Sequence, residues 1–165
     1  MKILAIDPGP AQSGFVVLTN NRVESSGVML NDDMRSYLMP SNAELLAIEM
    51  IASYGMPVGR EVFETCVYIG RLVEAWNWAR CLMQPRRPSV LVYRKDVKMH
   101  LCGTPRAKDG HIRQALIDLL GPPGKKSDPG PTYGVKSHAW AALAVAVTAA
   151  SCQPDGIGVQ GRNAS

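Results

Sequence analysis

The hydrophobic pattern along the chain predicts buried strands alternating with amphipathic helices. Residues 3–6 are an uninterrupted apolar run, long enough for a fully buried strand, and residues 43–48 are a second candidate. Apolar residues at helical spacing predict a long amphipathic helix from residue 60 to about 79. Small apolar residues dominate positions 138–150, which predicts a final helix suited to close packing on a sheet.

Shorter segments complete the predicted fold. Residues 14–18 and 22–30 are expected to be strands joined by a tight turn at Asn20 and Asn21, because Asn tolerates left-handed backbone. The first three strands are therefore predicted to be antiparallel. A further strand is expected at 90–93, and helices at 31–39, 97–101 and 109–119. The predicted helix caps are Asn31 or Asp32, Asp109, and Ser137.

The length and the cysteine content suit one soluble domain. With 165 residues, 46% of them hydrophobic, the chain is expected to form a single domain over 1–152, followed by a flexible tail at 153–165. No apolar run is long enough for a membrane span and no leader opens the chain, so we expect a cytoplasmic protein. The four cysteines are scattered without Cys-x-x-Cys pairs, which argues against a zinc site.

Charge is distributed unevenly along the chain. Residues 1–79 hold five Lys and Arg against nine Asp and Glu, whereas residues 80–126 hold eleven against three. A basic segment of this kind favours a polyanion such as nucleic acid, because neutralised phosphates release counterions. A merely solvated basic surface is the alternative.

Two predicted strands end on carboxylates. Asp7 follows the first buried strand and precedes Pro8-Gly9, and Glu49 follows the second candidate strand. Oxygen ligands of this type suit Mg²⁺ or Mn²⁺, and two such ions about 3.5–4 Å apart can promote phosphodiester hydrolysis. The site would need a third ligand, for which the helix after Ser137 is the obvious donor. Alternatively, Asp7 only starts a turn.

Three motifs in this order resemble the RuvC-type Holliday junction resolvases, and most closely their phage and prophage members. They are Ile-Asp7-Pro-Gly9, Ala-Ile-Glu49 with the loop 53–59 after it, and the Ala-rich helix after His138. The resemblance implies an α/β ribonuclease H-like fold, with a mixed five-stranded sheet flanked by helices. It also implies a homodimer that nicks four-way DNA junctions symmetrically during recombination and repair, in the cytoplasm of a bacterium or a phage-infected host.

The resemblance also assigns site residues. Asp7 and Glu49 match the first and second acids of the family, and His138 matches a ligand position that is usually Asp and sometimes His. The fourth ligand position falls on Ala141, which cannot coordinate a metal. Three explanations stay open: a site of two acids and a histidine, a ligand from elsewhere, or a non-catalytic junction- or RNA-binding protein. Asp109 could supply the missing carboxylate, although a plain helix cap is the favoured interpretation.

Candidate DNA contacts come from the loops expected beside Asp7. The basic candidates for phosphate binding are Arg60, Lys95, Lys98, Arg106, Lys108 and Arg113. Tyr54 and Met56 could insert into an open junction centre, or they could simply pack their own loop. A third interpretation, an RNA-processing nuclease on the same scaffold, also stays open.

Overall fold

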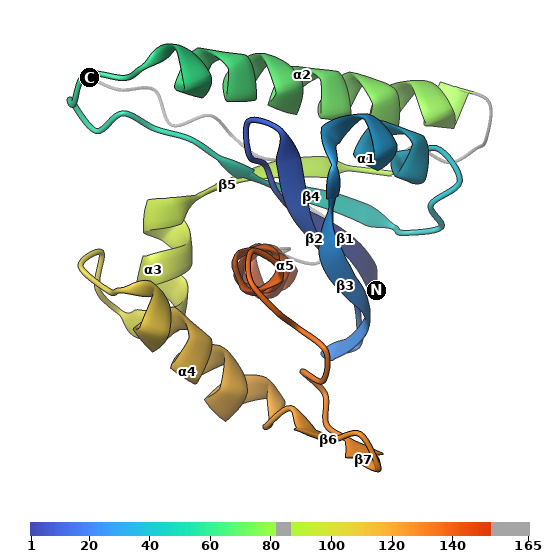
Figure 1. Cartoon of the computed structure of the whole chain (residues 1–165), viewed down its shortest axis with the longest axis vertical. Coiled ribbons are helices and arrows are strands. Elements are labelled where there is room, and N and C mark those ends of the chain that lie inside the picture. The colour runs from blue at the N-terminus through green and yellow to red at the C-terminus, as the bar shows by residue number, and fades with distance from the viewer. Residues whose placement is uncertain (82–86, 153–165) are drawn as a thin grey trace.

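A mixed sheet forms the centre of the molecule. The computed structural model describes residues 1–81 and 87–152, and these form one five-stranded sheet and one small hairpin (Figure 1). The strands of the main sheet lie in the order β3 (Arg22–Leu30), β2 (Gln12–Thr19), β1 (Lys2–Asp7), β4 (Leu45–Met50) and β5 (Ser89–Tyr93). The first three are antiparallel, whereas β4 runs parallel to both β1 and β5. The predicted fold class is confirmed.

Helices cover both faces of this sheet. One face carries α1 (Asn31–Leu38) and α2 (Arg60–Cys81), and the other carries α5 (Ala139–Ser151) (Figure 1). The helices α3 (Arg94–Cys102) and α4 (Asp109–Leu120) pack beside α5, and the hairpin of β6 (Gly124–Lys125) and β7 (Asp128–Pro129) lies between α4 and α5 in the chain. None of the described helices is long and apolar enough to cross a membrane. The predicted flexible tail lies outside the described residues.

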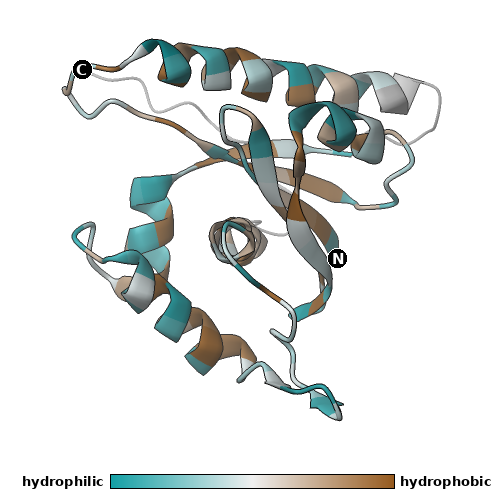
Figure 2. Cartoon of the chain, in the orientation of Figure 1, coloured by the Kyte–Doolittle hydropathy of each residue, from teal (hydrophilic) through white to brown (hydrophobic). Residues whose placement is uncertain are grey.

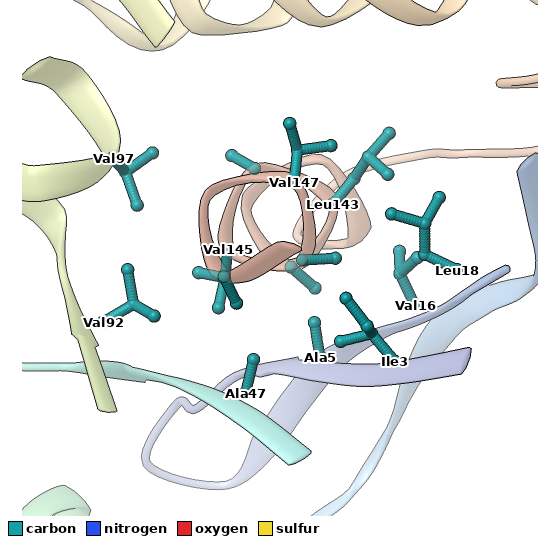
Figure 3. Close-up of a cluster of buried hydrophobic side chains, with 14 of the residues drawn as sticks. Ile3, Ala5, Val16, Leu18, Ala47, Val92, Val97, Leu143, Val145 and Val147 are labelled. Atoms are coloured by element: carbon teal, nitrogen blue, oxygen red, sulfur yellow. The ribbon is translucent and has the colours of Figure 1, made fainter. Parts of the chain in front are cut away.

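Strand alternation creates two hydrophobic cores, one on each face. Ile3 and Ala5 of β1 pack in the core with α5, whereas Leu4 and Ile6 pack in the core with α1 and α2. Figure 2 shows β4 as largely hydrophobic, and Figure 3 shows Ala5 and Ala47 beneath α5. Because β1 is buried on both faces, its residues are apolar on both sides, and the apolar run at residues 3–6 is therefore continuous.

The helix starts differ from the predicted caps by a residue or two. The N-cap residues are Leu30, Lys108 and His138. None of these three residues makes a side-chain cap hydrogen bond. Asn31 is engaged by the loop after β1, and Asp109 accepts a bond from Arg94, so both side chains serve tertiary contacts. The helix predicted at 97–101 begins earlier, at Arg94, directly after β5.

Candidate active site

Parallel pairing brings Asp7 and Glu49 to the same end of the sheet. Ile6 of β1 is in register with Ile48 of β4, so the next residues along the two strands are the two acids. Because Ala5 and Ala47 face α5, the period of two points both acids to that same face. The Asp7 side chain is 20% exposed and that of Glu49 is 13% exposed. The sheet therefore holds two neighbouring carboxyl groups that are largely removed from water.

Burial makes both acids hold their protons more tightly than usual. The pKa of Glu49 is raised to about 7, chiefly by desolvation and also by the nearby Asp7 carboxyl, while Arg94 opposes the shift. Desolvation also raises the pKa of Asp7, against the attraction of His138 and Arg94. The interaction between the two carboxyls raises the pKa of Glu49 and lowers that of Asp7, so a proton retained by the pair is held preferentially on Glu49.

His138 reaches this pair from the start of α5. Its Nδ1 lies 3.4 Å from Oδ2 of Asp7. Gly14, which pairs with Asp7 in the neighbouring strand, makes this approach possible, because a Cβ at Gly14 would lie 2.6 Å from the carbonyl oxygen of His138. The structure thus places Asp7, at the end of β1, between Glu49 of β4 and His138 at the cap of α5.

The loop after Asp7 is fixed by a hydrogen-bond network that the sequence did not reveal. The Nδ2 of Asn31 donates to the carbonyl of Gly9 (3.0 Å), and the Oδ1 of Asn31 accepts from the buried Ser13 hydroxyl (2.8 Å). The Tyr68 hydroxyl donates to the carbonyl of Asn31 (3.2 Å). These bonds connect the loop behind Asp7 to the start of α1 and to α2.

Arg94 is the site residue that the sequence analysis missed. Its Nη1 lies 3.5 Å from Oε2 of Glu49, and its Nη2 donates to Oδ1 of Asp109. Glu49 Oε2 and Arg94 Nη1 are both buried and neither has a hydrogen-bond partner in the described part of the chain. The available signal was position: Arg94 follows Tyr93, which is in register with Met50, the neighbour of Glu49.

Three hollows meet around Arg94. The first, of about 300 Å³, contains Asp7 and Glu49 and is called the acid hollow. The second, of about 250 Å³, contains Asp109, His138 and Ala141 and is called the helix hollow. The third, of about 220 Å³, is lined by Tyr54, Lys95, Lys98 and Pro105 and is called the basic hollow.

Arg94 lines all three hollows, so its side chain lies between the acids and the face of α5 that carries Ala141.

The predicted DNA-binding residues lie around this end of the sheet with different local contacts. Lys95 and Lys98 line the basic hollow, and Arg113 stacks 4.8 Å above the ring of Trp140 beside the helix hollow. Arg106 and Lys108 lie in the connection between α3 and α4. Arg60, at the start of α2, pairs with Glu64 at 2.6 Å while its side chain stays 90% exposed. The role of these cations in DNA binding stays a prediction.

The metal-ligand atoms available at this site suit one hard cation better than two. Two carboxylates and a neutral imidazole are suitable ligands for Mg²⁺ or Mn²⁺, and Oε2 of Glu49, which makes no hydrogen bond within the described residues, could serve as a ligand atom. No group of three His, Cys, Asp or Glu side chains is preassembled for a metal within residues 1–81 and 87–152. Ala141 offers no donor, and Asp109 is engaged by Arg94.

Comparison with known proteins agrees with the fold. The chain matches no protein-family model and no curated protein. Among solved structures it is similar to Thermus thermophilus RuvC, with a TM-score of 0.67, 20% identity, and coverage of 91% of this chain and 93% of that one. It is also similar to T. thermophilus RuvC in complex with a Holliday junction substrate, with a TM-score of 0.69, 19% identity and the same coverage of both chains. The chain therefore has the ribonuclease H-like fold of RuvC.

Proposed function

We propose that this protein is a metal-dependent, structure-selective endonuclease that cuts branched DNA, acting as a Holliday junction resolvase in recombination and repair. The observation that carries the proposal is the meeting of Asp7, Glu49 and His138 at one end of a RuvC-like sheet. The likeness to a RuvC solved with a Holliday junction supports the choice of substrate. The resemblance to phage and prophage members stays a prediction.

The three residues would together bind one metal ion. Asp7 and Glu49 would hold a divalent cation and His138 would complete its protein ligands. When bound, such an ion supplies Lewis acidity at the phosphate and lowers the pKa of a water. In the reaction, the water oxygen would bond to phosphorus and release a proton, the bond from phosphorus to the 3′ oxygen would break, and the leaving 3′ oxygen would take up one proton in return. The products are a 5′-phosphate and a 3′-hydroxyl.

Two features of the surface support binding of a junction by a dimer. Phe63, Val67 and Trp78 are 62%, 57% and 62% exposed on α2, and an apolar stripe of this kind is typical of a protein interface. Two copies related by a twofold axis would present two sites, as two symmetric nicks require. Lys95 and Lys98 with Tyr54 in the basic hollow form a cationic, aromatic surface suited to the DNA backbone and an unstacked base.

A cleavage assay on a synthetic four-way junction tests the proposal. Wild type should cut it at symmetric positions with Mg²⁺ or Mn²⁺ and should leave linear duplex of the same sequence intact. Asp7→Asn should lose cutting but retain junction binding, because the change removes one charge and keeps the shape. Asp33→Asn is the matched control, since Asp33 is exposed on α1, on the opposite face of the sheet from His138. Junction binding without any metal-dependent cutting would reject the nuclease.

One observation favours a second candidate function. Ala141 lacks the carboxylate that the family's fourth ligand position usually has, and a protein that had lost its metal site would show such a change. This second candidate is a non-catalytic protein that binds junctions or RNA. Competition between a junction, a linear duplex and a structured RNA at one salt concentration separates the candidates, because phosphate attraction alone does not distinguish shapes.

A further inference from the structure

Arg94 places a permanent positive charge beside Ala141, the ligand position that lacks a donor atom. Its guanidinium reaches Glu49 with Nη1 (3.5 Å) and Asp109 with Nη2, so one side chain links an acid of the sheet to an acid of α4. The side chain is 27% exposed and lines the acid hollow, the helix hollow and the basic hollow. No other described residue lines all of these three hollows.

The surroundings of Arg94 match those of a bound cation. Glu49 Oε2 faces Arg94 Nη1 across a buried contact in which neither atom has a hydrogen-bond partner, so the attraction there is one of charge. Ala141 shares the helix hollow with Arg94 and Asp109. A carboxylate at position 141 would therefore share the helix hollow with Asp109 and with the Arg94 guanidinium, which also reaches Glu49. Because position 141 is alanine, this carboxylate is absent, and the positive charge at this place is that of the Arg94 guanidinium.

We propose that Arg94, held by Asp109, takes the place of a second divalent cation, so that each protomer binds one metal ion through Asp7, Glu49 and His138. This inference rests on the proposed nuclease function and deepens it. The guanidinium supplies a second positive charge beside Glu49, which balances negative charge in the cleft when a phosphate enters. Arginine suits this task because it stays protonated and its planar fork can face carboxylate and phosphate together.

Counting bound Mn²⁺ ions by isothermal titration calorimetry tests this inference without measuring cleavage. Wild type should bind one ion per protomer. Arg94→Met removes the charge and frees Asp109, so this variant should bind a second ion or bind the first at least about tenfold more tightly, because like-charge repulsion is relieved. Arg94→Lys keeps the charge and should bind one ion. Should the methionine variant fail to fold, Arg94→Gln serves as a polar replacement for the same measurement.

Two further variants test the number of Mn²⁺ ions bound per protomer. Ala141→Asp alone should still bind one ion, because the new carboxylate meets Arg94, whereas Ala141→Asp combined with Arg94→Met should bind two. Arg22→Met is the matched control and should bind one ion. Arg22 pairs with Thr19, which in turn is in register with Lys2, so it lies at the end of the sheet opposite Asp7.

The outcomes separate this inference from the nuclease proposal. Two ions in wild type, or unchanged number and affinity in the Arg94→Met and Arg94→Gln variants, would overturn the role of Arg94 and leave the nuclease standing. An absence of Mn²⁺ binding in wild type would overturn both. One ion in wild type and a gain in the neutral Arg94 variants supports the inference, even if junction cleavage is later found to be absent.

Discussion

Replacing Glu49 by glutamine should change how the stability of the metal-free protein depends on pH. Burial raises the pKa of Glu49 from its ordinary value of 4.5 to about 7, so the folded protein favours the protonated carboxyl. Between these two pH values the folded state binds more protons than the unfolded state. The free energy of unfolding therefore falls as the pH rises through this window. Glutamine has the same shape but cannot ionise.

The size of the effect follows from the displacement of the pKa. One pH unit corresponds to about 1.4 kcal/mol, so ionising Glu49 in the folded state costs about 3 kcal/mol at pH 8. The side chain is only 13% exposed, so solvent screens this cost little. Glu49→Gln should therefore match wild type near pH 4 and be more stable by up to about 3 kcal/mol at pH 8. Burial also raises the pKa of Asp7, so this carboxyl contributes a dependence of the same sign.

Urea unfolding at pH 4, 6 and 8, with a chelator present, measures this difference. Glu74→Gln is the control, because Glu74 is exposed on α2, and its stability should follow wild type at each pH. Addition of Mn²⁺ at pH 8 should stabilise wild type and the control but not Glu49→Gln, which lacks the ligand charge. A wild-type stability that rises from pH 5 to 8, or a glutamine variant less stable than wild type at pH 8, would refute the reasoning.

Three other substitutions have defined outcomes. Gly14→Ala should lower the free energy of unfolding by about 1–3 kcal/mol in urea titrations, because its Cβ would lie 2.6 Å from the backbone oxygen of His138. Asn31→Ala should cost about 1–3 kcal/mol in the same assay, since it leaves the carbonyl of Gly9 and a buried hydroxyl without their partner. Lys98→Ala should weaken junction and duplex binding alike and reduce the slope of log affinity against log salt by about one, whereas an unchanged slope would remove Lys98 from the interface.

The parts of the fold set by local pattern were predictable from sequence. The run at residues 3–6 and the Asn20-Asn21 turn correctly indicated a buried strand and the antiparallel start of the sheet; both asparagines adopt positive φ, of 49° and 63°. The proximity of Asp7 and Glu49 was predictable for the same reason, because a carboxylate at the end of an apolar run is visible in the sequence, although β4 continues one residue beyond Glu49.

Features set by contacts between distant segments were not predictable from sequence. Arg94 looked like one more cation of a basic segment, and only the pairing of β5 with β4 places it against Glu49. The predicted caps were wrong at Asn31 and Asp109 because a tertiary partner competes for each side chain: the carbonyl of Gly9 for one and Arg94 for the other. Gly14 likewise has no local signal, since its need for a bare Cα arises from the backbone of His138.

The charge balance of the site links protonation to metal binding. While Glu49 is protonated, the pair of Asp7 and Glu49 carries at most one negative charge, and Arg94 with Asp109 forms a pair of opposite charges beside them. Loss of the Glu49 proton adds a negative charge in a desolvated place, which the proposed divalent cation would balance. Binding of the proposed ion should therefore release a proton when the pH is below about 7, and its affinity should fall as the pH is lowered. Arg94 would repel that ion at every pH, because its charge does not titrate. Raising the pH therefore favours the first ion, while the fixed guanidinium still disfavours a second.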